Sequence, residues 1–231
     1  MNSKIPCVAC GAAILPSTSK RTGGKCMPCS NDPHGIRAAQ LLGERTSTAS
    51  LLHMIEQAMT DAVLRVAASA ANTLADEGIY GCWLFHTQFL SVGGLTLFTE
   101  ATSRAGSRWS PDDSAHHLYL PDEFRHIDHL FHALEHRRDG KDVASEVECI
   151  CLRVLRRLRE ASLFSPRVLL SLAEGDQSCE QRYAYAELFS APVALEAFRV
   201  DVQPLNWQHI EIWRSQIVTK LSPMSAESPR N

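Results

Sequence analysis

The chain has 231 residues, of which 45% are apolar and 21% are charged. This balance excludes a largely disordered or collagen-like chain, and the length allows one or two globular domains. The 23 Lys and Arg residues against 26 Asp and Glu residues give a net charge of -3, so the protein as a whole does not attract nucleic acid or an anionic membrane. Eight cysteines are too few for a disulfide scaffold, so their positions matter more than their number.

The start of the chain lacks an apolar run of signal-peptide length. The longest apolar-rich stretch, residues 51–74, is interrupted by Glu56, Asp61 and Arg65, whereas a transmembrane helix needs about 20 mostly apolar residues. We therefore expect a cytoplasmic protein with no membrane segment, whose cysteines are reduced thiols or metal ligands.

Composition divides the chain into four parts. Residues 1–29 hold four of the eight cysteines and are rich in Gly, Ser, Thr and Pro, so they cannot form a hydrophobic core of their own. We predict a small metal-binding module there, a linker over residues 30–47, one domain over residues 48–221 and a disordered tail over residues 222–231.

The first half of the predicted domain reads as a long helix followed by two strands. Apolar residues at three- and four-residue steps predict a helix over residues 51–74, ended near Gly78. The aromatic and apolar run of residues 79–85 predicts a buried strand, and residues 95–98 predict a second strand antiparallel to it. Residues 104–114 are expected to be irregular.

The second half reads as helices around one further strand. A Val-Leu-Leu-Ser-Leu run predicts a strand over residues 168–172, and a polar loop is expected over residues 174–181. Helices are predicted over residues 121–137, 141–163, 188–198 and 206–221. The expected fold class is α+β, with a short, mainly antiparallel sheet packed by helices.

Two Cys-x-x-Cys pairs, Cys7 with Cys10 and Cys26 with Cys29, are separated by fifteen residues. Two thiolates three positions apart occupy two corners of a tetrahedron from one tight turn, with zinc–sulfur bonds of about 2.3 Å. The spacing therefore predicts one four-cysteine zinc site, and four protein ligands leave no position for water, so the zinc is structural. Two disulfides would conflict with the absence of a secretion signal. The residues between the pairs are expected to form a short β-hairpin.

The other four cysteines, Cys82, Cys149, Cys151 and Cys179, do not repeat this spacing. They are interpreted as reduced thiols, with Cys82 and Cys151 in the core.

Four histidines fall on one predicted helix, at positions 126, 129, 132 and 136. His126, His129, His132 and His136 span about 120° of the helix opposite its apolar stripe, so a solvated face is the favoured interpretation. A metal-binding pair, or a surface that gains charge below about pH 6.5, stays open as an alternative.

Known catalytic motifs are absent from the sequence, including nucleotide-binding glycine loops, the nucleophile elbow and the zinc-protease helix. A hydrolase site near His86 and the Trp109 loop remains an alternative, although the spacing of these residues does not indicate a catalytic site. Lys20, Arg21 and Lys25 lie between the cysteine pairs, and a nucleic-acid-binding regulator that uses them is a further alternative.

Residues 1–29 resemble a zinc ribbon in the paired Cys-x-x-Cys with Gly11 and Gly23-Gly24. Residues 48–203 resemble an uncharacterised bacterial family of single α+β domains. The shared features are Ile79-Tyr80-Gly81, Arg108-Trp109-Ser110-Pro111, residues 158–164 and residues 168–176. Members of such families are suspected to be immunity proteins that bind a partner toxin, or related interaction modules. The absence of a catalytic motif, the closed metal site and this resemblance together predict a non-catalytic, zinc-containing, protein-binding module, as in bacterial toxin immunity or a related interaction.

Overall fold

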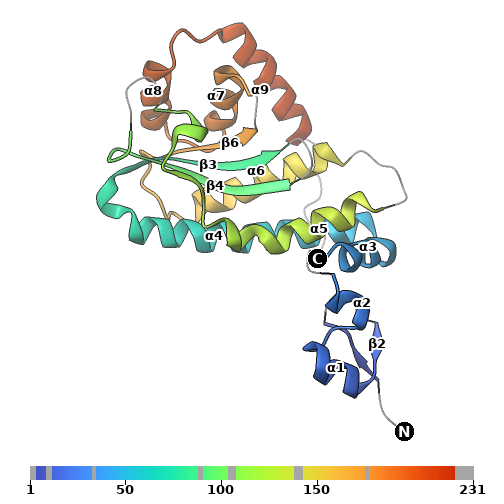
Figure 1. The fold of residues 1–231 in the computed structure, drawn as a ribbon. Coiled ribbons are helices and arrows are strands. Elements are labelled where there is room, and N and C mark those ends of the chain that lie inside the picture. Colours follow the sequence, from blue (N-terminus) through green and yellow to red (C-terminus); the bar gives the residue numbers. More distant parts are fainter. Residues whose placement is uncertain are drawn as a thin grey trace. The chain divides into compact units, whose positions relative to one another are not determined.

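The structure is a computed structural model that describes residues 4–8, 12–32, 35–87, 91–103, 108–137, 143–174 and 177–221. The chain forms two compact units, one made of residues 1–55 and 125–142 and the other of residues 56–124 and 143–231. Helix α4 (Thr48–Thr73) begins in the first unit and continues into the second (Figure 1). The boundaries predicted from composition stay predictions, and the predicted tail over residues 222–231 lies outside the described residues.

The first unit starts with a two-stranded antiparallel sheet, β1 (Ile5–Pro6) with β2 (Ala13–Ile14). Two short helices follow, α1 (Pro16–Thr22) and α2 (Met27–Ser30). The predicted hairpin between the cysteine pairs is therefore wrong, because β2 pairs with β1, which precedes Cys7, and residues 16–22 form helix α1. Pro16 at the first helical position suits the start of α1, and Gly23 in the left-handed region (φ 61°) ends it.

The first unit also contains α3 (Ile36–Arg45) and α5 (Arg125–Glu135), which pack against each other. The segment that holds α3 was expected to be a linker. Gly43 of α3 faces the backbone of Ala133 so closely that an added Cβ would lie 2.2 Å from the Ala133 carbonyl oxygen. The Arg137 guanidinium donates hydrogen bonds to the carbonyl groups of Gly43 and Thr46 at the end of α3. Tertiary contacts of this kind stabilise a helix too short to be stable alone.

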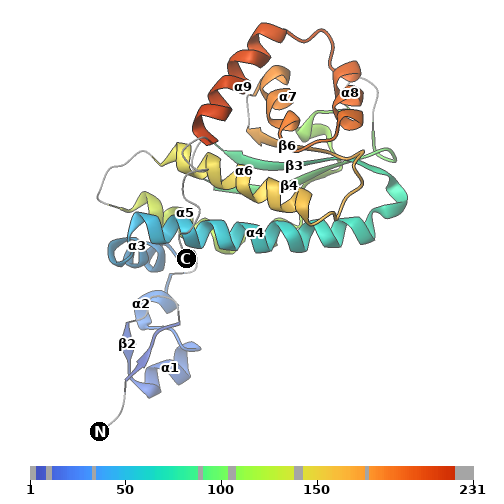
Figure 2. The same ribbon diagram turned by 180° about the vertical axis from the view of Figure 1, so that it is seen from behind.

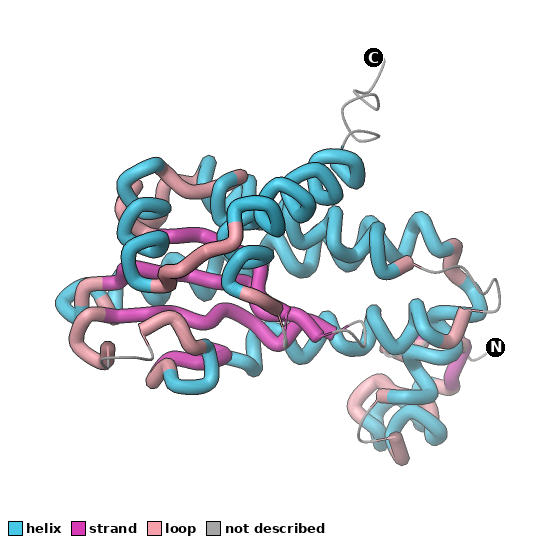
Figure 3. Tube along the Cα trace, turned by 90° about the horizontal axis from the view of Figure 1, so that it is seen from above, coloured by secondary structure: helices cyan, strands magenta, loops and turns pink. Residues whose placement is uncertain are grey.

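The second unit is built on one four-stranded sheet with the strand order β5-β4-β3-β6 (Figure 3). Strand β4 pairs antiparallel with both β3 and β5. Strand β6 pairs with β3 in parallel, with Gly81 opposite Leu169. The sheet is therefore short and mainly antiparallel, and the predicted α+β class is confirmed. The strands are β3 (Ile79–Thr87), β4 (Ser91–Thr99), β5 (His116–Tyr119) and β6 (Leu169–Glu174).

Helices cover both faces of this sheet. Residues 56–73 of α4 lie on one face together with α6 (Ala144–Glu160), and α7, α8 and α9 lie on the other (Figures 1 and 2). The Glu56 carboxylate joins the first two helices by accepting hydrogen bonds from Arg153 at 2.6 Å and Arg157 at 3.0 Å. The helices of the other face are α7 (Cys179–Glu187), α8 (Pro192–Asp201) and α9 (Trp207–Leu221).

Two elements of the second unit differ from the sequence prediction. Helix α7 occupies part of the expected polar loop, begins at the N-cap Ser178, and buries Tyr183 and Tyr185 among others, so it has no continuous polar face. Strand β5 is a short edge strand whose residues are all half-buried, which leaves no alternation of buried and exposed side chains. Single 3-10 turns occur at Ala75–Glu77, Pro111–Asp113 and Pro121–Phe124.

Candidate metal centre

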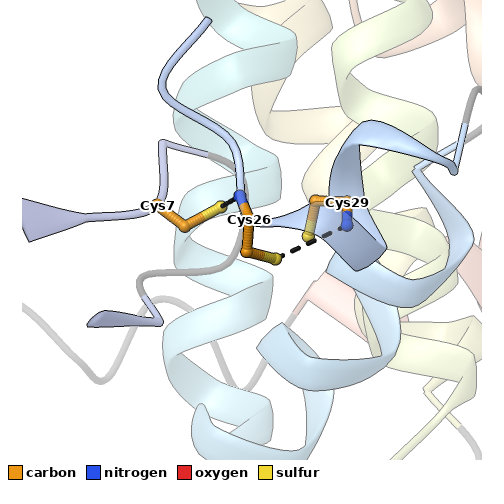
Figure 4. Close-up of side chains that lie close together, drawn as sticks. All are labelled: Cys7, Cys26 and Cys29. Carbon is orange, nitrogen blue, oxygen red and sulfur yellow. Dashed lines mark hydrogen bonds between the residues drawn. The ribbon is translucent and has the colours of Figure 1, made fainter. Parts of the chain in front are cut away.

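Three cysteines of the first unit converge at one point (Figure 4). Cys7 directly follows β1, Cys26 is the N-cap of α2 and Cys29 lies inside that helix. Their sulfur atoms all lie within 4.8 Å of one another. Cys7 and Cys29 are each only 3% exposed, and Cys26 is partly buried. The thiols pack with Ile14, Ala12 and Ala38 in a small cluster, which is the core of this part of the chain.

Backbone N–H groups point at these sulfur atoms. The N–H of Cys26 donates to Cys7 Sγ at 3.1 Å, and the N–H of Cys29 donates to Cys26 Sγ at 3.5 Å (Figure 4). Hydrogen bonds from backbone N–H groups stabilise negative charge on sulfur, and the thiolate is the form that binds metal. Two of the three sulfur atoms thus accept backbone N–H groups, an arrangement that suits metal-binding thiolates.

The described residues fit a thiolate-bound metal ion. A tetrahedral site with zinc–sulfur bonds of about 2.3 Å has sulfur–sulfur edges of about 3.8 Å, so a small contraction of the thiol group closes it around an ion. Soft thiolate ligands select ions such as zinc or Cu(I), or iron–sulfur clusters. Cys10, the fourth predicted ligand, lies outside the described residues. The Cys7 N–H donates a hydrogen bond of 2.8 Å to the Ala12 carbonyl oxygen.

The cysteines outside this group lie in the second unit. Cys82 and Cys151 are completely buried, and burial raises the pKa of each thiol to about 12. Cys149 is also buried, and burial raises its pKa, whereas Cys179 is partly exposed. Neutral buried thiols are chemically inert, which confirms that Cys82 and Cys151 belong to the core.

The four histidines of α5 and its end do not converge. His126, His132 and His136 are exposed, and His132 lies 3.2 Å from Glu135. His129 is partly buried instead, because its ring lies directly against Gly35, where an added Cβ would approach to 2.1 Å. Among the described residues, no histidine joins a group of three side chains close enough to share a metal ion.

His86 and Trp109, the residues of the hydrolase alternative, lie apart in the second unit. The Trp109 ring packs against Gly81, five positions before His86 on β3, and strand geometry puts about 16 Å between those two positions. The Trp109 indole is 7% exposed and donates a hydrogen bond of 2.9 Å to Asp201. Trp109 therefore serves as a packing residue in an aromatic cluster.

The structure brings together one polar pair that the sequence analysis missed, Glu77 and His116. A carboxylate oxygen of Glu77 lies 2.8 Å from His116 Nε2 and accepts a hydrogen bond of 3.0 Å from the Thr99 hydroxyl. The hydrogen bond with His116 lowers the pKa of the Glu77 carboxyl group. No sequence motif links residues 39 positions apart, and β4 brings them together because it pairs with β3, which follows Glu77, and with β5, which begins at His116.

The three cations between the cysteine pairs are exposed. Lys20 and Arg21 lie in the last turn of α1, and Lys25 precedes Cys26. Basic residues are favoured at the carboxyl end of a helix, so helix electrostatics alone explains the positions of Lys20 and Arg21.

Comparisons with protein-family models, with curated proteins and with solved structures found no match to this chain. The resemblance to a bacterial α+β family stays a prediction. Within the described part of the chain, no helix is long and apolar enough to cross a membrane.

Proposed function

We propose that Cys7, Cys10, Cys26 and Cys29 bind one structural zinc ion, and that the protein is a non-catalytic module that binds another protein. The observation that carries the metal site is the group of three thiols within 4.8 Å of one another, two of whose sulfur atoms accept backbone N–H groups. Cys10 is the fourth ligand by its spacing from Cys7. Zinc suits the site because it is redox-inert and prefers a tetrahedron of thiolates.

Metal analysis of the purified full-length chain tests the site. We expect about one zinc ion per chain, and substitution by Co²⁺ should give the visible absorption of tetrahedral thiolate coordination. Cys10→Ser and Cys26→Ser should both lose the ion, while Cys179→Ser, which changes a thiol of the other unit, should retain it. Full zinc content in Cys10→Ser, or none in the unmodified chain, would contradict the proposed site.

Exposed apolar side chains around the metal site support the protein-binding role. Four large apolar residues lie on the surface of a segment of about thirty residues: Ile5, Val8, Leu15 and Met27. Val8 is 73% exposed and Leu15 is 47% exposed. Several exposed apolar side chains within one short segment are typical of surfaces that a protein partner covers. The resemblance to immunity-like families suggests that the partner is a toxin encoded beside this protein.

Affinity capture of a partner from the native cell, followed by a binding measurement, tests this role. Leu15→Asp puts a charge on the apolar surface and keeps α1 intact, because Asp is a favoured N-cap residue. We expect it to weaken partner binding at least tenfold, because an unpaired charge buried in an apolar interface costs more than about 1.4 kcal/mol. Val193→Asp, which changes an exposed valine on α8, is the matched control and should bind normally.

A double charge reversal, compared with Leu15→Asp, separates this role from nucleic-acid binding. Retention of DNA or RNA that weakens steeply with salt, and is lost in Lys20→Glu with Arg21→Glu, would favour the regulator. A captured protein whose binding is unaffected by Leu15→Asp and lost in the double charge reversal would also count against the apolar surface.

A further inference from the structure

The second unit contains a cavity of about 720 Å³ that the proposed metal and partner functions do not use. It lies where α6 ends, where the loop to β6 begins, and where α7 leads into α8. Its volume lies within the range of about 300–1,000 Å³ that is typical of small-molecule sites. The lining residues are Arg156, Arg159, Glu160, Ser162, Leu163, Phe164, Ser165, Pro166, Leu188, Phe189, Ser190 and Ala191.

Arg159 is the central polar group of this cavity. Its Nε donates to the Phe189 carbonyl oxygen at 2.6 Å, and its Nη2 donates to the Val168 carbonyl oxygen at 2.9 Å. These two contacts fix the plane of the guanidinium and leave three of its five N–H groups for other acceptors. The side chain is thus held in one orientation before any ligand arrives.

The positive charge of Arg159 lacks a negative partner among the described residues. Neither Arg159 nor Arg156 forms an ion pair with a carboxylate in the described part of the chain. Burial lowers the pKa of the Arg159 guanidinium, and no nearby carboxylate offsets that effect. Glu160 is the single acidic residue of the lining, and it is exposed. A half-buried charge without a counter-ion is unfavourable, so an anion that enters the cavity would be stabilised.

The rest of the lining offers a polar side and an apolar side. The hydroxyl-bearing residues Ser162 and Ser165 lie on the loop after α6, and Ser162 has a φ of 53°, in the left-handed region where glycine is favoured. Non-glycine residues held in that region are frequent at ligand sites. Leu163, Phe164 and Phe189 line the cavity with apolar surface.

We propose that this cavity binds a small organic anion, with its carboxylate or phosphate group on Arg159 and Arg156 and its apolar part against the leucine and phenylalanine side chains. A phosphate and a carboxylate each present two oxygen atoms that can accept two parallel hydrogen bonds from a guanidinium. The site is independent of the thiol group, which lies in the other unit.

Titration of the full-length protein with three aromatic probes, followed by amide NMR shifts, tests the proposal. Phenyl phosphate and benzoate should give saturable shifts in residues 162–166 and 188–191. Benzyl alcohol, which has the same ring without the charge, should bind about tenfold more weakly, because it lacks a charge-assisted hydrogen bond. Tighter binding of phenyl phosphate would assign the natural ligand as a phosphate, and tighter binding of benzoate would assign it as a carboxylate.

Three variants locate the binding. Arg156→Gln and Arg159→Lys should each weaken binding of the anionic probes about tenfold. Lysine is chosen at position 159 because it keeps the positive charge in case folding requires it. Arg167→Gln is the matched control, because this exposed arginine is nearby and does not line the cavity, and it should change binding less than twofold. The proposal is overturned if no probe binds saturably, if benzyl alcohol binds as tightly as benzoate, or if Arg167→Gln has the same effect as Arg156→Gln. The Arg156 variant and the shift map decide the question even if the Arg159 variant does not fold.

Discussion

Gly43 allows α3 and α5 to pack at short range. A side chain at this position would collide with backbone, which cannot move as a flexible side chain can. In an exposed helix, replacing glycine by alanine stabilises the helix by about 1 kcal/mol, so the tertiary contact reverses the ordinary preference here.

We predict that Gly43→Ala destabilises the first unit by about 1–3 kcal/mol, the usual cost of overpacking. Hydrogen exchange of the α3 and α5 amides measures this local free energy. Gln40→Ala, which replaces an exposed residue of the same helix, should change it by less than about 0.5 kcal/mol. Unchanged protection in Gly43→Ala would show that the two helices are not held at this distance.

The pair formed by Glu77 and His116 makes stability depend on pH. Because His116 lowers the pKa of Glu77, the folded state binds the carboxyl proton less readily than the unfolded chain does. The stabilisation by the pair is therefore present above the unfolded pKa of about 4.3 and is lost as the pH falls through the lower folded value.

We predict that Glu77→Gln is less stable than the unmodified protein at neutral pH and that this difference shrinks toward zero below about pH 4. Urea unfolding followed by tryptophan fluorescence between pH 3 and pH 8 measures it. Asp76→Asn, which changes the exposed neighbouring residue, serves as the control and should alter the stability at neutral pH by less than about 0.5 kcal/mol. A difference that stays constant across the whole range for Glu77→Gln would rule out the linkage.

At the scale of elements, a side chain completes the edge of the sheet at β6. Ser190, which precedes α8, accepts a hydrogen bond from the Leu170 N–H at 2.9 Å and donates one to the Leu170 carbonyl oxygen at 3.0 Å. Leu170 is only 1% exposed, so water cannot replace these contacts. The hydroxyl thus takes the place of a neighbouring strand at one residue of the edge.

We predict that Ser190→Ala destabilises the second unit by about 1–3 kcal/mol, because it leaves two buried backbone groups unpaired. Urea unfolding with tryptophan fluorescence reports on this unit, since Trp83, Trp109, Trp207 and Trp213 all belong to it. Ser215→Ala on the exposed surface of α9 serves as the control and should stay within about 0.5 kcal/mol. Equal stability of the two variants would mean that the Leu170 N–H and carbonyl groups find other hydrogen-bond partners.

At the scale of the whole molecule, the proposed metal ligands and the tryptophans fall in different units. Among the described residues around the thiols, the buried core cluster consists of Cys7, Ile14 and Cys29, and two of these are proposed ligands. Because so little apolar surface is buried there, we expect this segment to obtain its folding free energy from metal binding.

We predict that removal of the metal by a chelator unfolds residues 4–32 and leaves the second unit folded. Amide NMR should show loss of dispersion for these residues, while the tryptophan emission stays unchanged. Returning zinc should restore the spectrum. A shift in tryptophan emission on chelation would mean that the second unit also depends on the metal.

The sequence predicted most elements of the second unit, because apolar periodicity and strand composition are local signals. The long helix α4 and the strand β3 agree with their predicted ranges to within a few residues. Helix α7 was missed because it is buried on several sides and has no amphipathic period. Helix α3 was missed because its stability depends on contact with α5, which is distant in sequence.

The sequence by itself predicted both cysteine pairs of the proposed metal site, since ligand spacing in a tight turn is a property of a few adjacent residues, and the structure brings Cys7, Cys26 and Cys29 together. It also determined the α+β class from local patterns. Only the tertiary structure decided the parallel partnership of β3 with β6, the pairing of Glu77 with His116 and the position of Arg159 in a cavity without a counter-ion. Each of these depends on residues far apart in the chain, whose approach is set by the packing of whole elements and by no local preference.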